Sequence, residues 1–156
     1  GLPMSVLLIR PELDQWKPGE HTGTFRGNNL AFVAAERALQ YWRNDDFRAE
    51  ISRKGHRLRQ DLENLVQAYP DAIRECRGVG MIHGLQFIDA DQCKRVAQSA
   101  FKQGLIIETC GSESDVLKIL PPLVIPDDVL QEGLTLLRHS IEVALESPTT
   151  LVPSQP

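Results

Sequence analysis

The sequence lacks the features that mark membrane-spanning and nucleic-acid-binding proteins. No apolar run among its 156 residues approaches the roughly 18 residues that a membrane helix needs. No block of lysine and arginine stands out, and the formal net charge is −4. We therefore expect neither a membrane nor a nucleic acid as a partner.

Cysteine is scarce, and its spacing does not suggest a cross-link or a metal. The three residues Cys76, Cys93 and Cys110 form an odd number, and no Cys-x-x-Cys pair occurs. This pattern argues against a disulfide framework and against a zinc site. Reduced thiols with a structural role are the expectation.

The N-terminal segment GLPMSVLLIR lacks an initiator methionine and the marks of a secretion signal. It has no basic start and no small-x-small cleavage site, so its apolar part is expected to form a strand. These features predict a cytoplasmic protein. The opening on Gly1 suggests a chain from which a preceding part has been cut away.

What is present is typical of a globular protein. Hydrophobic residues make up 42% of the sequence and charged residues 24%. The length fits one domain, or one domain plus a piece of another. A chain of this size buries about 70% of the surface that its unfolded form exposes, so a substantial core is expected.

The first part of the chain predicts a strand, a loop and two helices. Ser5–Arg10 has four consecutive apolar residues and predicts a buried strand, and residues 11–27 predict a loop. A helix should begin at Asn28 or Asn29, which suit a helix N-cap, and fade near Asn44. Apolar spacings of three, four and seven predict a longer helix over Asp46–Tyr69.

The other face of that longer helix carries a basic stripe that we expect to be solvated. Its members are Arg48, Arg53, Lys54, Arg57 and Arg59.

Beyond Pro70 the spacing of hydrophobic residues switches between the period of a strand and that of a helix. The order is β-β-α-β-β-α, which predicts an α+β unit with its helices on one face of a mainly antiparallel sheet. The expected elements are strands Ile73–Cys76 and Met81–Ile88, a helix Asp91–Gln103 with Phe101 in its apolar stripe, strands Leu105–Thr109 and Val116–Leu120, and a helix from Asp127.

Three regions are expected: residues 1–44, a strand and helix that resemble a piece of a larger sheet; residues 45–147, the α+β unit; and a frayed tail over 148–156.

Several residues invite a functional interpretation but are better explained by packing. His21 has no metal-ligand partner at a suitable spacing and is expected to pack in the loop, with Trp16 as a loop anchor. His83 lies among apolar strand residues and is expected in the core. Gly78 and Gly80 stand between two strands rather than before a helix, so a turn is favoured over a phosphate cradle.

The stretch HTGTFRGNN, from His21 to Asn29, is the most informative segment. Thr22 and Thr24 offer hydroxyl groups, and Gly23 and Gly27 let a ligand approach the backbone. The helix that follows should present free N–H groups and a positive dipole end. The combination is compatible with a phosphate site, and a capped helix beside a polar loop remains the alternative.

A resemblance to a known family bears on that choice. The residues His21, Thr24, Phe25, Gly27, Asn28, Leu30 and Ala31 resemble the H-x-x-T-F-x-G-N-x-L-A signature of class III aminotransferases, which are pyridoxal-phosphate enzymes of fold type I. Two further runs, RGVGMIHG from Arg77 and LPPLVI from Leu120, also resemble family motifs in the same order and spacing. The resemblance covers residues 1–145.

The resemblance implies a fold and a set of site residues. The chain would be the C-terminal small α+β domain of a fold type I enzyme, preceded by a strand and helix from the large α/β domain. Thr24, with the backbone at Phe25, would bind the phosphate of pyridoxal 5′-phosphate held by the other subunit of a homodimer. Lys118 stands where many relatives have an arginine that binds a substrate carboxylate. Lys118 would then bind a carboxylate, or alternatively point to solvent from a strand edge.

The family's cofactor-bonding lysine lies upstream of Gly1, and none of the five lysines of this chain has the matching context. The resemblance therefore implies a chain with no transaminase activity alone. WKPGEH followed by TFRGNN most resembles the subgroup that moves an amino group between glutamate and aspartate semialdehyde to give 2,4-diaminobutyrate and 2-oxoglutarate. An aminotransferase for ornithine, acetylornithine or 4-aminobutyrate, and a non-catalytic dimerisation module, are the alternatives.

Overall fold

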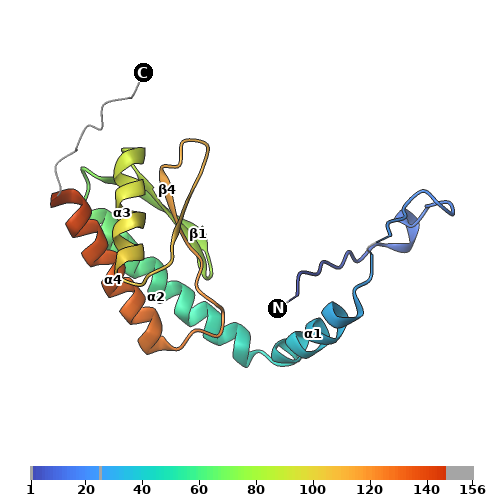
Figure 1. The fold of residues 1–156 in the computed structure, drawn as a ribbon. Helices are drawn as coiled ribbons and strands as arrows, with labels where there is room; N and C mark the ends of the chain where they lie inside the picture. The colour runs from blue at the N-terminus through green and yellow to red at the C-terminus, as the bar shows by residue number, and fades with distance from the viewer. Residues whose placement is uncertain (1, 25, 147–156) are drawn as a thin grey trace, which may run out of the picture. The chain divides into compact units, whose positions relative to one another are not determined.

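The computed structural model describes residues 2–24 and 26–146, and the chain divides into two units. The first unit is Gly1–Arg48 and the second is Ala49–Pro156 (Figure 1). Residues 147–156, for which a frayed tail was expected, lie outside the described residues.

The first unit contains helices and loops. Its elements are the 3-10 helix η1 (Pro11–Leu13), the helix α1 (Asn29–Leu39), the 3-10 helix η2 (Gln40–Trp42) and the start of α2 (Asp46–Ala68). The prediction of a strand over Ser5–Arg10 is wrong, because a buried strand needs a neighbour for its backbone groups and no strand occurs among the described residues of this unit. Val6, Leu7 and Leu8 are consequently 67%, 77% and 92% exposed.

The start of α1 lies where the sequence predicted it. Asn28 has an extended backbone, and its side-chain oxygen accepts hydrogen bonds from the N–H groups of Leu30 and Ala31 at 3.0 and 3.2 Å. Gly27 precedes it with a φ of +84°, a conformation that favours glycine. The helix ends at Leu39, earlier than expected, and η2 continues the turn.

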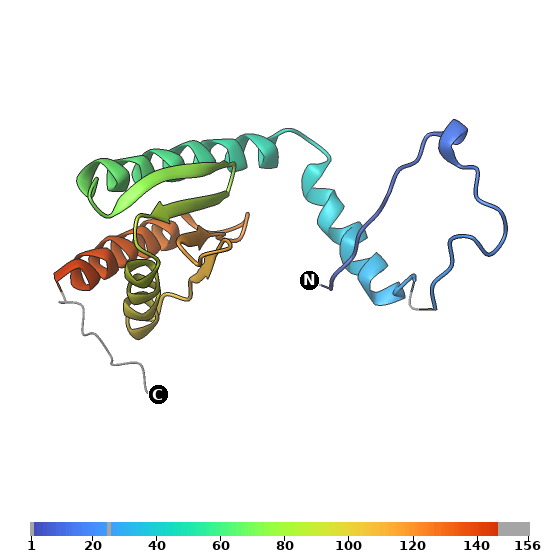
Figure 2. The same ribbon diagram turned by 90° about the horizontal axis from the view of Figure 1, so that it is seen from above.

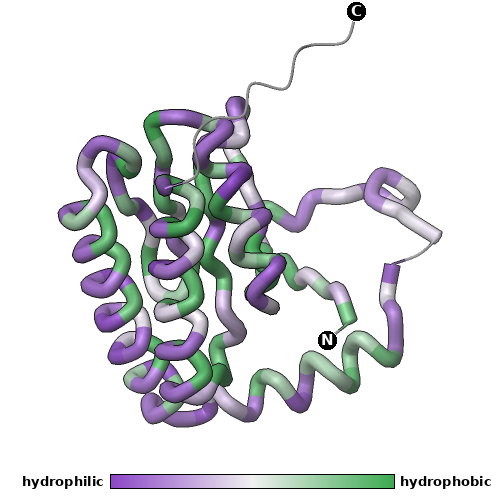
Figure 3. Tube along the Cα trace, turned by 60° about the vertical axis from the view of Figure 1, so that its left-hand side comes forward, coloured by the Kyte–Doolittle hydropathy of each residue, from purple (hydrophilic) through white to green (hydrophobic). Residues whose placement is uncertain are grey.

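Helix α1 is unusually apolar for its exposure. Leu30 and Val33 are 72% and 67% exposed, and Phe32 is about half exposed. The predominance of hydrophobic residues along α1 contrasts with α2, α3 and α4, where hydrophobic and hydrophilic positions alternate (Figure 3). Apolar side chains in such a group are typical of a surface that another chain or segment covers.

The second unit is an α+β sandwich, which confirms the predicted fold class. All strand pairs are antiparallel, and the sheet order is β1-β2-β4-β3. Its elements are α2, β1 (Ile73–Val79), β2 (Ile82–Phe87), α3 (Ala90–Lys102), β3 (Glu108–Cys110), β4 (Val116–Ile119) and α4 (Asp127–Glu146). Strand β3 is shorter and later than predicted, and Gly104 ends α3 with a φ of +89°.

The three helices cover one face of the sheet. A single core cluster joins α2, α3 and α4 to alternate strand residues. Those strand residues are Leu85, Phe87, Leu117 and Ile119, all buried, and the buried His83 lies on the same side of β2. The residues between them are half-buried or exposed, and we call their side of the sheet the open face. It includes Arg77, Val79, Ile82, Gly84, Gln86 and Lys118.

The hairpin between β1 and β2 lies along α2 (Figure 2). A β-carbon added to Gly55 in α2 would lie 2.6 Å from the carbonyl oxygen of Gly80, so the helix and hairpin backbones meet without a side chain between them. The turn itself is at Gly80 and Met81, rather than at Gly78–Gly80 as predicted, because Gly78 and Val79 still pair within β1.

Two predicted side-chain placements are wrong. Phe101 was expected in the buried stripe of α3, but it lies near the end of the helix and is 69% exposed. Lys54 was expected on the solvated face of α2, but it is only 6% exposed. Its ammonium group donates to the carbonyl oxygen of Ile125 at 2.6 Å and pairs with Glu50 at 3.3 Å.

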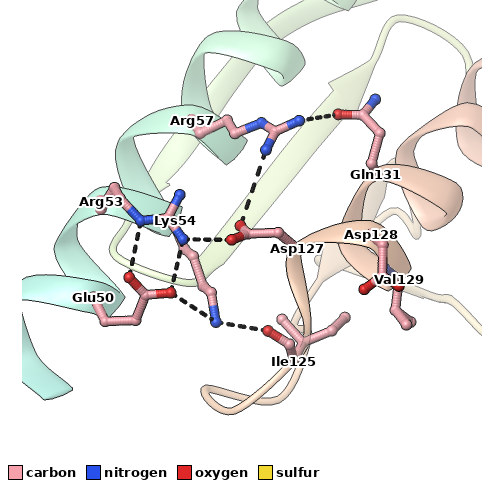
Figure 4. A network of polar contacts seen from close by, with 9 residues as sticks. All are labelled: Glu50, Arg53, Lys54, Arg57, Ile125, Asp127, Asp128, Val129 and Gln131. Atoms are coloured by element: carbon pink, nitrogen blue, oxygen red, sulfur yellow. Dashed lines mark hydrogen bonds and ion pairs between the residues drawn. The ribbon is translucent and has the colours of Figure 1, made fainter.

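Lys54 belongs to a polar network that joins α2 to the start of α4 (Figure 4). Arg53 donates two hydrogen bonds to Glu50, at 2.9 and 2.7 Å, and a third to Asp127 at 2.7 Å. Arg57 bonds to Gln131 and pairs with Asp127 at 3.9 Å. The network holds Ile125 and the start of α4 against α2.

Candidate cofactor- and substrate-binding residues

The loop before α1 exposes the hydroxyl group of Thr24. The Thr24 side chain is exposed and has no hydrogen-bond partner among the residues that the structure describes. Phe25, the other residue expected at a cofactor phosphate, lies outside the described residues. Gly23 directly precedes Thr24, but the Arg26 side chain packs against it, since a β-carbon on Gly23 would lie 2.9 Å from Nε of Arg26.

The rest of this loop is held by contacts around His21. The rings of Trp16 and His21 stack with their centroids 4.7 Å apart and their planes 17° apart. Arg26 donates to the carbonyl oxygen of His21 at 3.1 Å and contacts its ring nitrogen Nδ1 at 3.4 Å. The expected packing roles of His21 and Trp16 are therefore confirmed.

The expectation of free N–H groups at the start of α1 needs a correction. The Asn28 side chain already accepts from the N–H groups of Leu30 and Ala31. An anion at this helix end would have to compete with that cap. The cap occupies two of the first N–H groups of α1, and the hydroxyl of Thr24 has no partner among the described residues.

Lys118 lies in the middle of the sheet rather than at its edge. Strand β4 pairs with β2 on one side and with β3 on the other, so the alternative of a strand-edge position is wrong. The Lys118 ammonium donates to Glu108 at 2.6 Å, across the β3–β4 pair. This contact raises the pKa of Lys118 and lowers the pKa of Glu108. Lys118 is therefore a fixed positive charge on the open face.

An apolar pocket of about 380 Å³ adjoins Lys118 within the second unit. Its lining comes mainly from α4, from residues 118–122 and from residues 104–107. Lys118 and Glu132 are the charged residues of the lining. The pocket would hold an apolar group better than a charged one.

The buried histidine and the thiols have structural roles. His83 is 3% exposed, and its Nε2 lies 2.9 Å from the Gly80 carbonyl oxygen, which confirms the expected core position. All three cysteines are free thiols. Burial raises the pKa of Cys93 to about 12 and also raises the pKa of Cys76, so both are poor nucleophiles.

A comparison with protein families decides where this chain belongs. The family described as "Aminotransferase class-III" matches residues 1–141. This chain belongs to the class III aminotransferases. The predicted α+β architecture agrees with the fold type I enzymes of this family, and the family uses pyridoxal phosphate as its cofactor.

Among curated proteins, this aminotransferase chain is similar to two enzymes named diaminobutyrate–2-oxoglutarate transaminase. One, from Wolinella succinogenes, is 49% identical over 141 residues, which cover 90% of this chain and 33% of the relative. The other, from Bordetella parapertussis, is 49% identical over 156 residues, which cover 97% of this chain and 36% of the relative. The chain thus spans about a third of the length of these relatives.

Among solved structures, the lysine aminotransferase of M. tuberculosis superimposes with a TM-score of 0.74. The match covers 81% of this chain and 29% of that enzyme, at 20% sequence identity, and it shows the fold alone. Within residues 2–24 and 26–146, no helix is both long enough and apolar enough to cross a bilayer.

The residues of this class III chain fit one part of the cofactor. The exposed hydroxyl of Thr24, which has no partner among the described residues, would suit a phosphate oxygen. Of the lysines, Lys54, Lys94 and Lys118 are engaged with Ile125 and Glu50, with Asp91 and with Glu108 respectively.

Sequence reasoning missed two residues of the open face. Glu108 is the partner of Lys118, and Arg77 lies in the same cross-strand row through Gly84. Strand parity would have placed Arg77 on the side opposite Cys76, but the pairing of β2 with β4, whose nearest partners Gln86 and Val116 are 30 residues apart, has no local signal in the sequence.

Proposed function

We propose that this chain is the C-terminal portion of a pyridoxal-phosphate-dependent diaminobutyrate–2-oxoglutarate transaminase. The complete enzyme would move an amino group between glutamate and aspartate semialdehyde, forming 2-oxoglutarate and 2,4-diaminobutyrate. The names of the curated relatives at 42–49% identity support this substrate assignment. The observation that carries the role of this chain is the exposed Thr24 hydroxyl in front of a capped helix, without a partner among the described residues.

Thr24 would donate a hydrogen bond to a phosphate oxygen of the cofactor, and the backbone N–H of Phe25 would donate a second. The bound cofactor supplies the electron sink that amino-group transfer requires. A hydrogen bond to a charged oxygen contributes roughly 1.5–3 kcal/mol, so Thr24 alone would account for about a tenfold or greater gain in cofactor affinity.

Lys118 would bind a substrate carboxylate from the open face of the sheet. To do so it exchanges Glu108 for the ligand, which costs little because exposed ion pairs contribute about 0–1 kcal/mol. A lysine holds a carboxylate as a point charge, whereas an arginine forks onto both oxygens. The orientation of the substrate would therefore depend on a second group, since Lys118 fixes the position of the carboxylate but not its rotation.

The second subunit of a homodimer would supply the cofactor that Thr24 contacts. The exposed apolar residues Leu30, Phe32 and Val33 on α1 support an interface next to this loop. We expect the isolated 156-residue chain to self-associate. Sedimentation that gives a monomer over the micromolar range would contradict this interface.

The lysine that bonds the cofactor would lie outside these 156 residues, so the chain alone would be inactive. The test is visible absorbance after mixing the chain with pyridoxal phosphate and removing free cofactor. No retained band above 400 nm is expected. A retained band that disappears in Lys54→Met or Lys118→Gln would show a covalent site within the chain and overturn this part of the proposal.

The substrate assignment is tested on the complete polypeptide that carries this chain. With glutamate as the amino donor, aspartate semialdehyde should give the highest kcat/KM among the amino acceptors. Ornithine, acetylornithine and 4-aminobutyrate are the matched alternative donors, since other class III enzymes use them. Faster turnover with any of these three would assign the enzyme to another branch of the family. It would not bear on the cofactor role of Thr24, which is tested separately.

A further inference from the structure

The loop that carries Thr24 is held by two side chains. Asn28 fixes the start of α1, because its side-chain oxygen accepts hydrogen bonds from two N–H groups of the helix. Arg26 reaches back along the chain, and its guanidinium group donates to the carbonyl oxygen of His21 at 3.1 Å. Apart from the bonds of these two side chains, no side-chain hydrogen bond joins the described residues between 21 and 28. The position of Thr24 ahead of the helix therefore depends on Arg26.

Arg26 also closes the turn in which Thr24 lies. The backbone N–H of Arg26 donates to the carbonyl oxygen of Gly23 at 3.1 Å, and Thr24 is the first central residue of this turn. The Arg26 side chain packs against Gly23, where a β-carbon would lie 2.9 Å from Nε. A side chain at position 23 would have to push the guanidinium group aside. The backbone and the side chain of Arg26 thus act on the same turn.

The residue to which Arg26 is tied has support of its own. The His21 ring stacks on Trp16 with the centroids 4.7 Å apart, and its Nδ1 lies 3.4 Å from Nη2 of Arg26. Directly before His21, the N–H of Glu20 donates to the Lys17 carbonyl oxygen at 3.0 Å. The N–H of Lys17 donates in return to the Glu20 carboxylate at 2.8 Å. Arg26 therefore ties the Thr24 turn to a segment that is itself closed by hydrogen bonds.

We propose that Arg26 is a positioning residue of the cofactor-phosphate site. It ties the turn to His21 and so holds the Thr24 hydroxyl in place before the cofactor arrives, without contacting the phosphate itself. Ordering the backbone of one residue during binding lowers affinity by roughly tenfold, so a turn that is already closed preserves part of the affinity. The inference rests on the function proposed above, because it assumes that Thr24 binds a phosphate oxygen.

A double-mutant cycle on the complete enzyme tests this role. The dissociation constant of pyridoxal phosphate is measured for the parent, Arg26→Met, Thr24→Ala and the double variant. Arg26→Met, which keeps an apolar stem, should raise the dissociation constant about fivefold. In the Thr24→Ala background the same change should raise it less than about twofold, because no hydroxyl remains to be positioned. Arg26→Lys, which can still donate to the His21 carbonyl oxygen, should raise it about twofold.

Arg10→Met is the matched control. Arg10 is an arginine of the same unit whose side chain is 82% exposed and pairs with Glu12 at 3.9 Å. The control removes the same charge as Arg26→Met, and the dissociation constant should change less than about twofold. An equal rise in Arg10→Met and Arg26→Met would show a general effect of positive charge on an anionic cofactor and would overturn the positioning role.

The cycle also separates this inference from the proposed function. Equal effects of Arg26→Met with and without the Thr24 hydroxyl would overturn the positioning role, because Arg26 would then act on the phosphate or on the whole unit. An effect of Thr24→Ala without one of Arg26→Met would refute the positioning role and leave the proposed function standing. No effect of Thr24→Ala would refute both.

Amide hydrogen exchange in the complete polypeptide without cofactor gives a second readout. In Arg26→Met, the peptide containing residues 22–27 should exchange about threefold faster after correction for the intrinsic rate of the new residue. A peptide from α3 should be unchanged. This measurement needs neither transaminase activity nor cofactor, so it decides whether Arg26 holds the turn even if the proposed function fails. Unchanged exchange of residues 22–27 would refute the positioning role.

Discussion

Lys54 and Ile125 lie 71 residues apart in the sequence, yet the ammonium group of Lys54 donates a 2.6 Å hydrogen bond to the Ile125 carbonyl oxygen. The contact joins the middle of α2 to the segment that follows Lys118. Burying a charged group is costly unless it is paired, and Glu50 lies 3.3 Å from the Lys54 ammonium. The network around Lys54 therefore joins α2 to Ile125 and to the start of α4.

The first prediction concerns Lys54→Met, which keeps the apolar stem and removes the donor. The Ile125 carbonyl would lose its partner in a buried setting, so the free energy of unfolding should fall by about 1–3 kcal/mol. Urea unfolding of the 156-residue chain measures this change. Lys102→Met is the control, because Lys102 is exposed at the end of α3. Equal unfolding midpoints for the two variants would contradict the structural role of Lys54.

The second prediction compares two helical glycines. Gly55→Ala should destabilise the chain although alanine favours helices, because the new methyl group would lie 2.6 Å from the Gly80 carbonyl oxygen. Gly133→Ala in α4 should stabilise it by about 0.5–1 kcal/mol, since its nearest neighbour would be 3.9 Å away. Thermal unfolding of both variants gives the result. A stabilising Gly55→Ala would show that α2 and the hairpin do not meet as described.

The third prediction concerns acid stability. Hydrogen bonds from Arg53 lower the pKa of Glu50 from its ordinary value of 4.5 to about 2. Since the folded pKa is below the unfolded one, ionised Glu50 stabilises the fold above about pH 4.5, and this contribution is lost as the pH falls toward 2. Glu50→Gln should therefore be less stable than the parent at pH 6, and the two should converge near pH 2.

Urea midpoints at pH 6, 4, 3 and 2 test this dependence. Glu132→Gln is the control, because Glu132 is an exposed carboxylate of α4 without an ion-pair partner among the described residues. A constant difference between Glu50→Gln and the parent across this range would contradict the role of the Arg53 contact.

The sequence predicted those parts of the fold that depend on local signals. Asn28 caps α1, Gly104 ends α3, and the apolar spacing of α2 gives its bounds to within a residue, because capping, left-handed glycine and helical period are all local. The strand expected over Ser5–Arg10 did not form, because strand formation depends on a neighbour that local sequence cannot supply. The burial of Lys54 was missed for a similar reason, since its acceptor is 71 residues away.

The candidate site was predicted unevenly. Thr24 and Lys118 came from the family resemblance, and the structure adds that one is exposed and the other lies centrally in the sheet. Arg77 carries a positive charge and lies on the open face, as Lys118 does. Its alignment with Lys118 through Gly84 depends on the β2–β4 pairing. Cross-strand register is set by the whole hydrophobic pattern and not by any single residue.

The binding of pyridoxal phosphate to the complete enzyme, with and without the hydroxyl of residue 24, tests the central claim most directly. Thr24→Ala should raise the dissociation constant about tenfold or more, and Thr24→Ser should restore most of the affinity. Thr22→Ala, which removes an exposed hydroxyl two residues away, should leave the dissociation constant unchanged. A Thr24→Ala enzyme that binds the cofactor as tightly as Thr22→Ala would contradict the account.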